Sequence, residues 1–154
     1  MYTRCSFSDA IGQTIGTSRW FDVGQDRIDA FAQASEDHQF IHVDPDRARQ
    51  GPFGRTIAHG FLTLSLLSAM LYDCGPEIEG EVMAVNYGFN RLRFLSPVPA
   101  GARLRAVFVL KAADAKGPDA IEITFDVTVE IEGQDKPALS AEWINRRYFE
   151  GQTA

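Results

Sequence analysis

A run of apolar residues between Ala58 and Tyr72 limits the folds open to this chain more than any other feature. At the helical spacing its large side chains cover almost the whole circumference; they are Phe61, Leu62, Leu64, Leu66, Leu67, Met70 and Leu71. A helix that is apolar on every side is stable in water only when other elements surround it. Gly75-Pro76 comes directly after the run and is typical of a helix end. We therefore expect one long buried helix inside an enclosing layer.

The second half of the chain contains the strands that could enclose such a helix. Apolar residues at odd positions from Ile121 to Ile131 alternate with polar residues at even positions from Glu122 to Glu132. This period of two predicts an antiparallel strand with one buried and one wet face. Further strands are predicted at 12–23, 81–94, 103–113 and 139–149, and an amphipathic helix at 25–35.

These elements predict an α+β domain in which a curved antiparallel sheet of about five strands wraps around the long helix. A 15-residue helix is about 22 Å long, which is comparable to the width of a sheet. The alternative is a helix lying flat on an open sheet, and it would leave part of the apolar circumference in water. The length of 154 residues and the 45% hydrophobic content fit a single domain, 1–154.

Charge and cysteine content narrow the function classes. The net charge of −6 argues against a nucleic-acid partner, although Arg91, Arg93, Arg103 and Arg105 are candidates for a local basic pocket. Cys5 and Cys74 form no disulfide or metal-binding framework, which favours a reducing compartment. The N-terminus lacks the apolar run of a signal peptide, and the longest apolar segment is shorter than the roughly 20 residues of a membrane span. We expect a cytoplasmic protein without membrane association.

The segment Ser35–Pro45, SEDHQFIHVDP, is the candidate for chemistry. It places two of the three histidines and three acidic residues beside Phe40 and Ile41, a mixture that suits the wall of a ligand pocket. Alone, His42 would more often be a half-buried structural histidine. His38, His42 and Asp37 also match a two-histidine, one-carboxylate metal site, but this spacing is common by chance, and no metal is expected.

Residues later in the chain complete a pattern that this segment begins. Asp37 and His42, then His59-Gly60 opening the apolar helix, then Ser68 eight residues after Gly60, resemble the MaoC-like dehydratases, which include the (R)-specific enoyl-CoA hydratases. Three positions depart from that family's pattern: Glu36 replaces Gly, Gln39 replaces Asn and Phe40 replaces Pro. This variant, with PFGRTIAHGFLTLSLL after it, resembles the nodulation-protein-N-like branch.

The resemblance implies a hot-dog fold and reversible hydration of trans-2-enoyl thioesters to (R)-3-hydroxyacyl thioesters. By that resemblance Asp37 and His42 activate one water, and Ser68 donates a hydrogen bond to Asp37. The N–H of Gly60 is expected to bind the thioester oxygen. His59 could be catalytic, but a helix N-terminus disfavours a charged imidazolium, which favours a structural role in holding the loop before Gly60. The implied substrate is an acyl-CoA or acyl-carrier thioester, the assembly is a homodimer, and no cofactor is required.

Two other functions stay open at this point. Some hot-dog proteins are acyl-CoA thioesterases that use a carboxylate near the central helix, but the pairing of Asp37 with His42 speaks against this. A non-catalytic acyl-thioester binding protein is the second alternative. The intact pair argues against it without excluding it.

Overall fold

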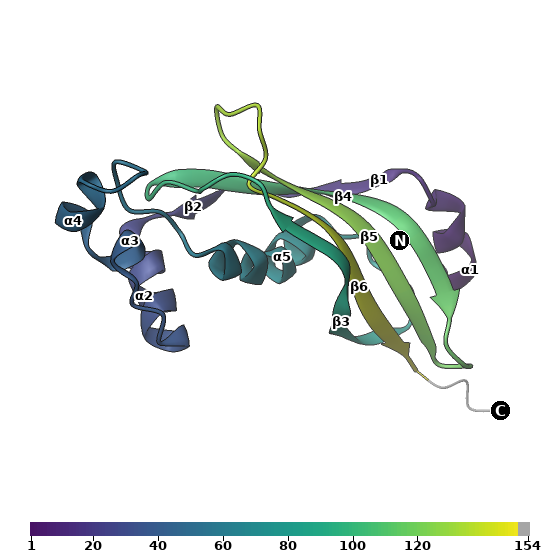
Figure 1. Ribbon diagram of the computed structural model, residues 1–154. Helices are drawn as coiled ribbons and strands as arrows, with labels where there is room; N and C mark the ends of the chain where they lie inside the picture. Colours follow the sequence, from purple (N-terminus) through teal and green to yellow (C-terminus); the bar gives the residue numbers. More distant parts are fainter. Residues whose placement is uncertain (151–154) are drawn as a thin grey trace.

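The computed structural model describes residues 1–150 and shows a curved sheet with one long helix beneath it (Figure 1). The helical elements are α1 (Arg4–Phe7), the 3-10 turn η1 (Ser8–Ala10), α2 (Gln25–Ser35), α3 (Phe40–Val43), α4 (Pro45–Arg49) and α5 (Gly60–Cys74). The strands are β1 (Thr14–Thr17), β2 (Phe21–Val23), β3 (Glu81–Phe94), β4 (Ala102–Ala115), β5 (Ala120–Ile131) and β6 (Leu139–Phe149). Helices α2, α3 and α4 gather beyond one end of the sheet.

The sheet is antiparallel with the strand order β1-β4-β5-β6-β3, and β2 pairs with β4 next to β1. It therefore has six strands where about five were predicted, because the early strand at 12–23 is divided into β1 and β2. Ser18 causes the division: its N–H donates to the carbonyl of Ala106, and its hydroxyl accepts from the Ala106 N–H at 3.0 Å. A side chain thus replaces the backbone acceptor at that step of the ladder.

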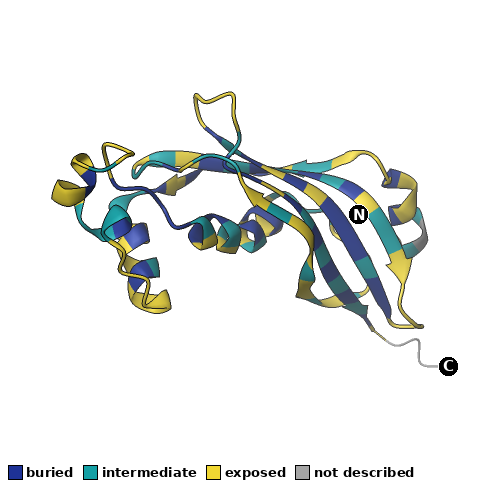
Figure 2. Ribbon diagram, viewed as in Figure 1, coloured by how far each residue is buried: buried dark blue, intermediate teal, exposed yellow. Residues whose placement is uncertain are grey.

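The predicted alternation along β5 is confirmed. Its odd-numbered apolar residues are buried, while Asp126 and Thr128 on the other face are exposed (Figure 2). Strand β6 shows the same alternation, with every second residue from Leu139 to Phe149 buried. One face of the sheet is therefore core and the other carries the charges, as expected for an antiparallel sheet that is solvated on one side.

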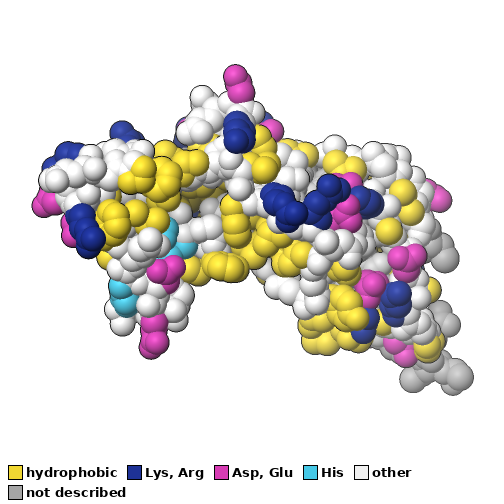
Figure 3. Space-filling view, in the orientation of Figure 1, with side chains coloured by type: hydrophobic (Ala, Val, Ile, Leu, Met, Phe, Trp, Pro, Cys, Tyr) yellow, Lys and Arg dark blue, Asp and Glu magenta, His cyan; other side chains and the backbone are white. Residues whose placement is uncertain are grey.

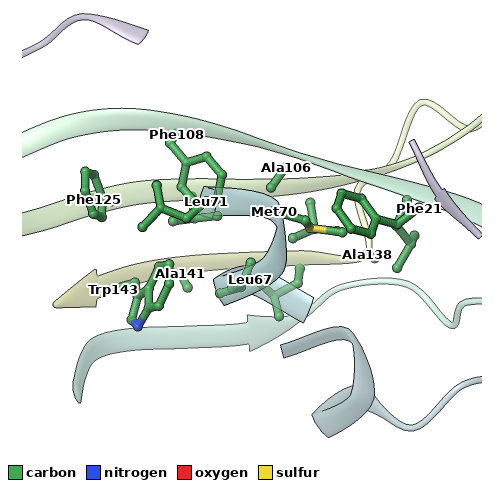
Figure 4. Close-up of a cluster of buried hydrophobic side chains, with 14 of the residues drawn as sticks. Phe21, Leu67, Met70, Leu71, Ala106, Phe108, Phe125, Ala138, Ala141 and Trp143 are labelled. Carbon is green, nitrogen blue, oxygen red and sulfur yellow. The ribbon is translucent and has the colours of Figure 1, made fainter. Parts of the chain in front are cut away.

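Helix α5 lies against the concave face of this sheet and supplies the centre of the core. Its Leu71 lies beside Phe108 of β4 and its Met70 beside Phe21 of β2, while Leu67 belongs to the same buried cluster as Phe125 and Trp143 (Figure 4). The side chains of Leu67, Met70 and Phe108 are at most 1% exposed. The fold is the predicted α+β hot-dog fold.

The sheet covers only one side of α5 in the single chain. Phe61 is 64% and Tyr72 82% exposed on the opposite side of the helix. The expectation that the helix would be buried all round is therefore wrong for one protomer. The prediction assumed that the sheet closes around the helix, whereas the curved sheet stops at its edge strand β3 and leaves the lower face of α5 open.

The charged residues of the outer face form ion pairs instead of gathering into a basic pocket. Arg91 pairs with Glu142, and Arg103 and Arg105 pair with Glu132 and Glu130 across neighbouring strands. Figure 3 shows such clusters of Lys and Arg mixed with carboxylates over the sheet. Within the described part of the chain, these three arginines therefore do not form the suggested local basic pocket.

Two further sequence predictions concern membranes and cysteines. Within residues 1–150, no helix combines the length and the apolar character needed to cross a membrane. Cys74, near the end of α5, is a free thiol whose pKa burial raises to about 11. The side chain of Cys5 lies outside what the structure describes.

Candidate active site

The residue before Asp37 ends α2 in a left-handed conformation. Glu36 has a φ of 61° and is the one non-glycine residue with positive φ among those described. Glycine favours this conformation at a helix end, which explains why the family pattern has Gly at this position. The chain then reverses: the Asp37 carboxylate accepts a hydrogen bond from the Gln39 N–H at 3.3 Å, and α3 begins at Phe40. Asp37 is thereby held on an exposed turn between α2 and α3.

His42 lies at the end of this segment, on α3, and is only 6% exposed. Its Nδ1 is 2.7 Å from the carbonyl oxygen of Ile57. A carbonyl can only accept, so Nδ1 carries the hydrogen and Nε2 keeps a free lone pair. The Ile57 N–H in turn donates to the carbonyl of Ile41 at 2.9 Å. These contacts fix both the tautomer and the direction of the imidazole.

Residues that the sequence did not reveal hold α3 in place. The side-chain amide of Gln25 in α2 donates to the carbonyl of His42 at 2.7 Å. Its amide oxygen accepts from the Thr56 hydroxyl at 2.6 Å. Gln25, Thr56 and Ile57 come from segments that are separated in the sequence, and no local pattern identifies such long-range polar partners.

His59 completes the group and is buried, with 2% of its surface exposed. Its Nε2 donates to the backbone carbonyl of Asp37 at 2.9 Å. Its ring stacks on that of His42 with centroids 3.8 Å apart, and Phe31 of α2 lies 4.9 Å from it on another side. The structure therefore brings Asp37, His42 and His59 together, from two segments separated in sequence.

The spacing of Asp37 and His42 suits one shared water. A carboxylate oxygen of Asp37 and one nitrogen each of His42 and His59 all lie within 4.8 Å of one another. Since a hydrogen bond to water spans about 2.7–3.0 Å, one water can contact both members of the pair at such a separation. His42 lies on the buried side of this pair, and Asp37 lies on the side that is open to solvent.

Burial lowers the pKa of His42 below its usual value, and the proximity of His59 lowers it further. The hydrogen bond to Ile57 and the charge of Asp37 act in the opposite direction. Because the net direction is downward, the imidazole is neutral at physiological pH and its Nε2 can accept a proton.

Gly60 begins α5 directly after His59. Within residues 1–150 its N–H donates no hydrogen bond to the protein, as is usual for the first turn of a helix. A Cβ at this position would come within 3.1 Å of the Phe94 ring, which lies over it from the end of β3. The lack of a side chain therefore makes room for Phe94 as well as leaving the N–H accessible.

Ser68 is not part of this group in the single chain. It lies about 12 Å farther along α5 and lines a different cavity of about 720 Å³, between α5 and the start of β3, with Tyr72, Ala84, Trp143 and Arg147. Among the described residues, no hydrogen bond joins Ser68 to Asp37. The expected contact is absent because eight residues of helix separate Ser68 from the end of α5 that Asp37 approaches.

The group of Asp37, His42 and His59 does not fit a shared metal ion. The rings of the two histidines are stacked with their planes 26° apart. Imidazole lone pairs lie in the ring plane, so those of two stacked rings run side by side and do not converge on one ion. His38 of the predicted metal alternative is exposed and lies outside this group.

Comparisons with known proteins identify the family of this chain. A family model described as the MaoC like domain matches residues 6–132. Nodulation protein N of Rhizobium leguminosarum bv. viciae is 52% identical over 141 residues, covering 91% of this chain and 88% of that protein. The 3-hydroxyacyl-thioester dehydratase Z of Mycobacterium tuberculosis is 46% identical and covers 89% and 90%, respectively.

A solved structure shows the same fold. The (R)-hydratase from Aeromonas caviae, described as involved in PHA biosynthesis, aligns with a TM-score of 0.67 at 27% identity, over 88% of this chain and 94% of that one. The family match covers most of the sequence, including all the residues grouped around Asp37. The chain belongs to the MaoC-like domain family, and nodulation protein N is among its close homologues.

Proposed function

We propose that this protein catalyses the reversible (R)-specific hydration of trans-2-enoyl thioesters to 3-hydroxyacyl thioesters. The observation that carries the proposal is the pairing of an exposed carboxylate, Asp37, with a neutral imidazole, His42, within reach of one water. The free N–H of Gly60 lies at the start of the helix that His59 precedes. The names of a dehydratase and an (R)-hydratase among the similar proteins support this reaction class.

The reaction needs a proton acceptor, a proton donor and an oxyanion partner. The water oxygen forms a bond to the β-carbon while one of its protons passes to the Asp37–His42 pair. A proton passes from the pair to the α-carbon, so the pair ends with as many protons as it had before. Both transfers occur on the face of the alkene that the pair contacts, which gives syn addition. Each positioned proton transfer contributes roughly 10²–10⁴-fold.

The start of α5 stabilises the charge that develops on the thioester oxygen. The free N–H of Gly60 and the positive end of the helix dipole both favour negative charge at this place. This chemistry uses only groups of the chain, so we expect turnover without an added metal or cofactor.

Hydration of crotonyl-CoA by the purified protein tests the proposal. We expect the enoyl absorbance to fall with time and 3-hydroxybutyryl-CoA of the (R) configuration to accumulate. Release of free CoA without hydration would show a thioesterase instead. Binding without turnover across short and long enoyl chains would show an acyl-thioester binding protein.

We further propose that the working unit is a homodimer formed through β3 and the open side of α5. β3 is a 14-residue edge strand with several exposed apolar side chains: Val82, Met83, Val85, Tyr87 and Phe89. An exposed apolar edge of this length is a template for pairing with another chain. Phe61 and Tyr72 of α5 extend the same apolar surface.

Substitution of Tyr72 by Lys tests the dimer. In one protomer Tyr72 is 82% exposed, so Tyr72→Lys should leave its fold intact, whereas a lysine in an apolar interface is strongly unfavourable. By light scattering after size exclusion, we expect the wild type at about twice 17.1 kDa and the variant shifted toward 17.1 kDa. Ile11→Lys, at an exposed apolar residue before β1 on the opposite edge, is the matched control. A wild type of 17.1 kDa would contradict the dimer.

A further inference from the structure

The buried imidazole of His59 links the separate segments that form the candidate site. Its Nε2–H donates to the backbone carbonyl of Asp37, and its ring covers that of His42. The next residue along the chain is Gly60, the first of α5. His59 therefore connects the backbone of the Asp37 turn, the ring of His42 and the start of α5.

His59 also has one ring nitrogen without a hydrogen-bond partner among the described residues. That nitrogen, Nδ1, is buried. A buried unpaired polar atom is unfavourable, and a phenylalanine or leucine would fill the same space without it. A residue needed only for packing would not carry that defect, so a functional demand is the better explanation of an imidazole here.

We propose that His59 is the positioning residue of this site: it ties the Asp37 turn to the start of α5 and holds its own ring stacked against the imidazole of His42. The proposal rests on the proposed hydration and adds a role for the one buried histidine that the reaction itself does not use.

The groups around the two rings explain why a positive charge on the stacked pair is disfavoured. Asp37 is the acidic group that faces them, and α2 contributes Gln25 and Phe31, which do not titrate. The α5 end contributes the positive pole of its dipole. Two imidazolium rings stacked at 3.8 Å in a buried place would repel each other, so charging one disfavours charging the other. In agreement with this, His59 is among the causes that lower the pKa of His42.

Two substitutions separate the hydrogen bond to the Asp37 carbonyl from the stacking of the His59 ring on His42. His59→Gln places an amide N–H near the former Nε2 position and can still donate to the Asp37 carbonyl, but it does not titrate. His59→Phe keeps a ring against His42 and removes the unpaired Nδ1, but it has no donor.

We expect His59→Phe to lose about 10²-fold or more in kcat with KM little changed, because small misplacements of reacting groups have effects of this size. The thermal stability of His59→Phe should not fall along with its kcat. His59→Gln should stay within about tenfold of the wild type. In both variants the acid limb of kcat/KM should move to higher pH, because His42 loses a neighbour that lowers its pKa. His38→Asn, at the exposed neighbouring histidine, should change neither kcat nor the acid limb of kcat/KM.

The tautomer of His42 gives a readout that does not depend on turnover. Long-range ¹H–¹⁵N spectra of the wild type should show His42 as the Nδ1–H form, and titration should give a higher pKa in both His59 variants. Wild-type kcat in His59→Phe, or an unmoved His42 titration in both variants, would overturn the proposal. If the wild type were inactive but the titration of His42 shifted as expected in the variants, the proposed hydratase activity would be wrong. The coupling between the two histidines would still be supported.

Discussion

Replacing Asp37 by Asn is expected to lower kcat/KM for enoyl-CoA hydration by roughly 10²–10⁴-fold. The amide oxygen can still accept the hydrogen bond from the Gln39 N–H, and the backbone carbonyl still accepts from His59. Asp37 is exposed, so no buried charge or packing is lost. The variant therefore removes one proton-transfer group and leaves the turn intact. The measurement is the initial rate of hydration over a range of crotonyl-CoA concentrations.

The adjacent residue offers a matched control. His38 is exposed, lies next to Asp37 on the same turn and has no part in the group with His42. His38→Asn should keep wild-type rates, and unfolding curves of both variants should overlay that of the wild type. If Asp37→Asn retained more than about a tenth of the activity, the carboxylate would not be a proton-transfer group and the proposed mechanism would be wrong.

The same pair of variants separates hydration from thioester hydrolysis. In a hydratase, Asp37→Asn abolishes loss of the enoyl group and no free CoA appears with either protein. In a thioesterase that uses this carboxylate, release of CoA by the wild type would disappear in the variant. Measuring both products in one reaction distinguishes the two functions.

The sequence predicts most of the sheet because local pattern and tertiary environment agree there. Strands β3 and β6 occupy the predicted ranges, 81–94 and 139–149. The division of the early strand was missed because it depends on Ser18 meeting Ala106, a contact between segments 88 residues apart. The open side of α5 was missed for a related reason: apolar periodicity reports that a surface must be covered, but not whether the same chain or a second one covers it.

The candidate site could also be predicted only in part from the sequence. The spacing from Asp37 to His42, and the position of His59-Gly60, could be interpreted from the resemblance to known dehydratases. The stacking of His59 on His42 and the support from Gln25, Thr56 and Ile57 could not, because these contacts arise only when α2, α3 and the start of α5 meet. The role of Ser68 could not be assigned from its spacing in the family pattern alone, because in the single chain Ser68 lines another cavity.

Gly60→Ala is expected to lower kcat by about 10²–10³-fold, the effect of losing an oxyanion donor, which corresponds to about 2.7–4 kcal/mol of transition-state stabilisation. Alanine is a good helix residue, and Gly60 has no positive φ, so the backbone itself tolerates the change. The added Cβ has two possible effects. It can displace the Phe94 ring, which lies 3.1 Å from its position, or it can keep the thioester oxygen away from the N–H.

The double variant Gly60→Ala/Phe94→Ala distinguishes these effects. Phe94 is 47% exposed at the end of β3, so its ring can yield to the new methyl group or be removed without opening a core cavity. We expect Phe94→Ala alone to have a small effect on kcat and the double variant to stay as impaired as Gly60→Ala. Recovery of activity in the double variant would mean that the glycine serves the contact with Phe94. The oxyanion would then have to be bound by another donor, and the start of α5 would lose its proposed role in the reaction.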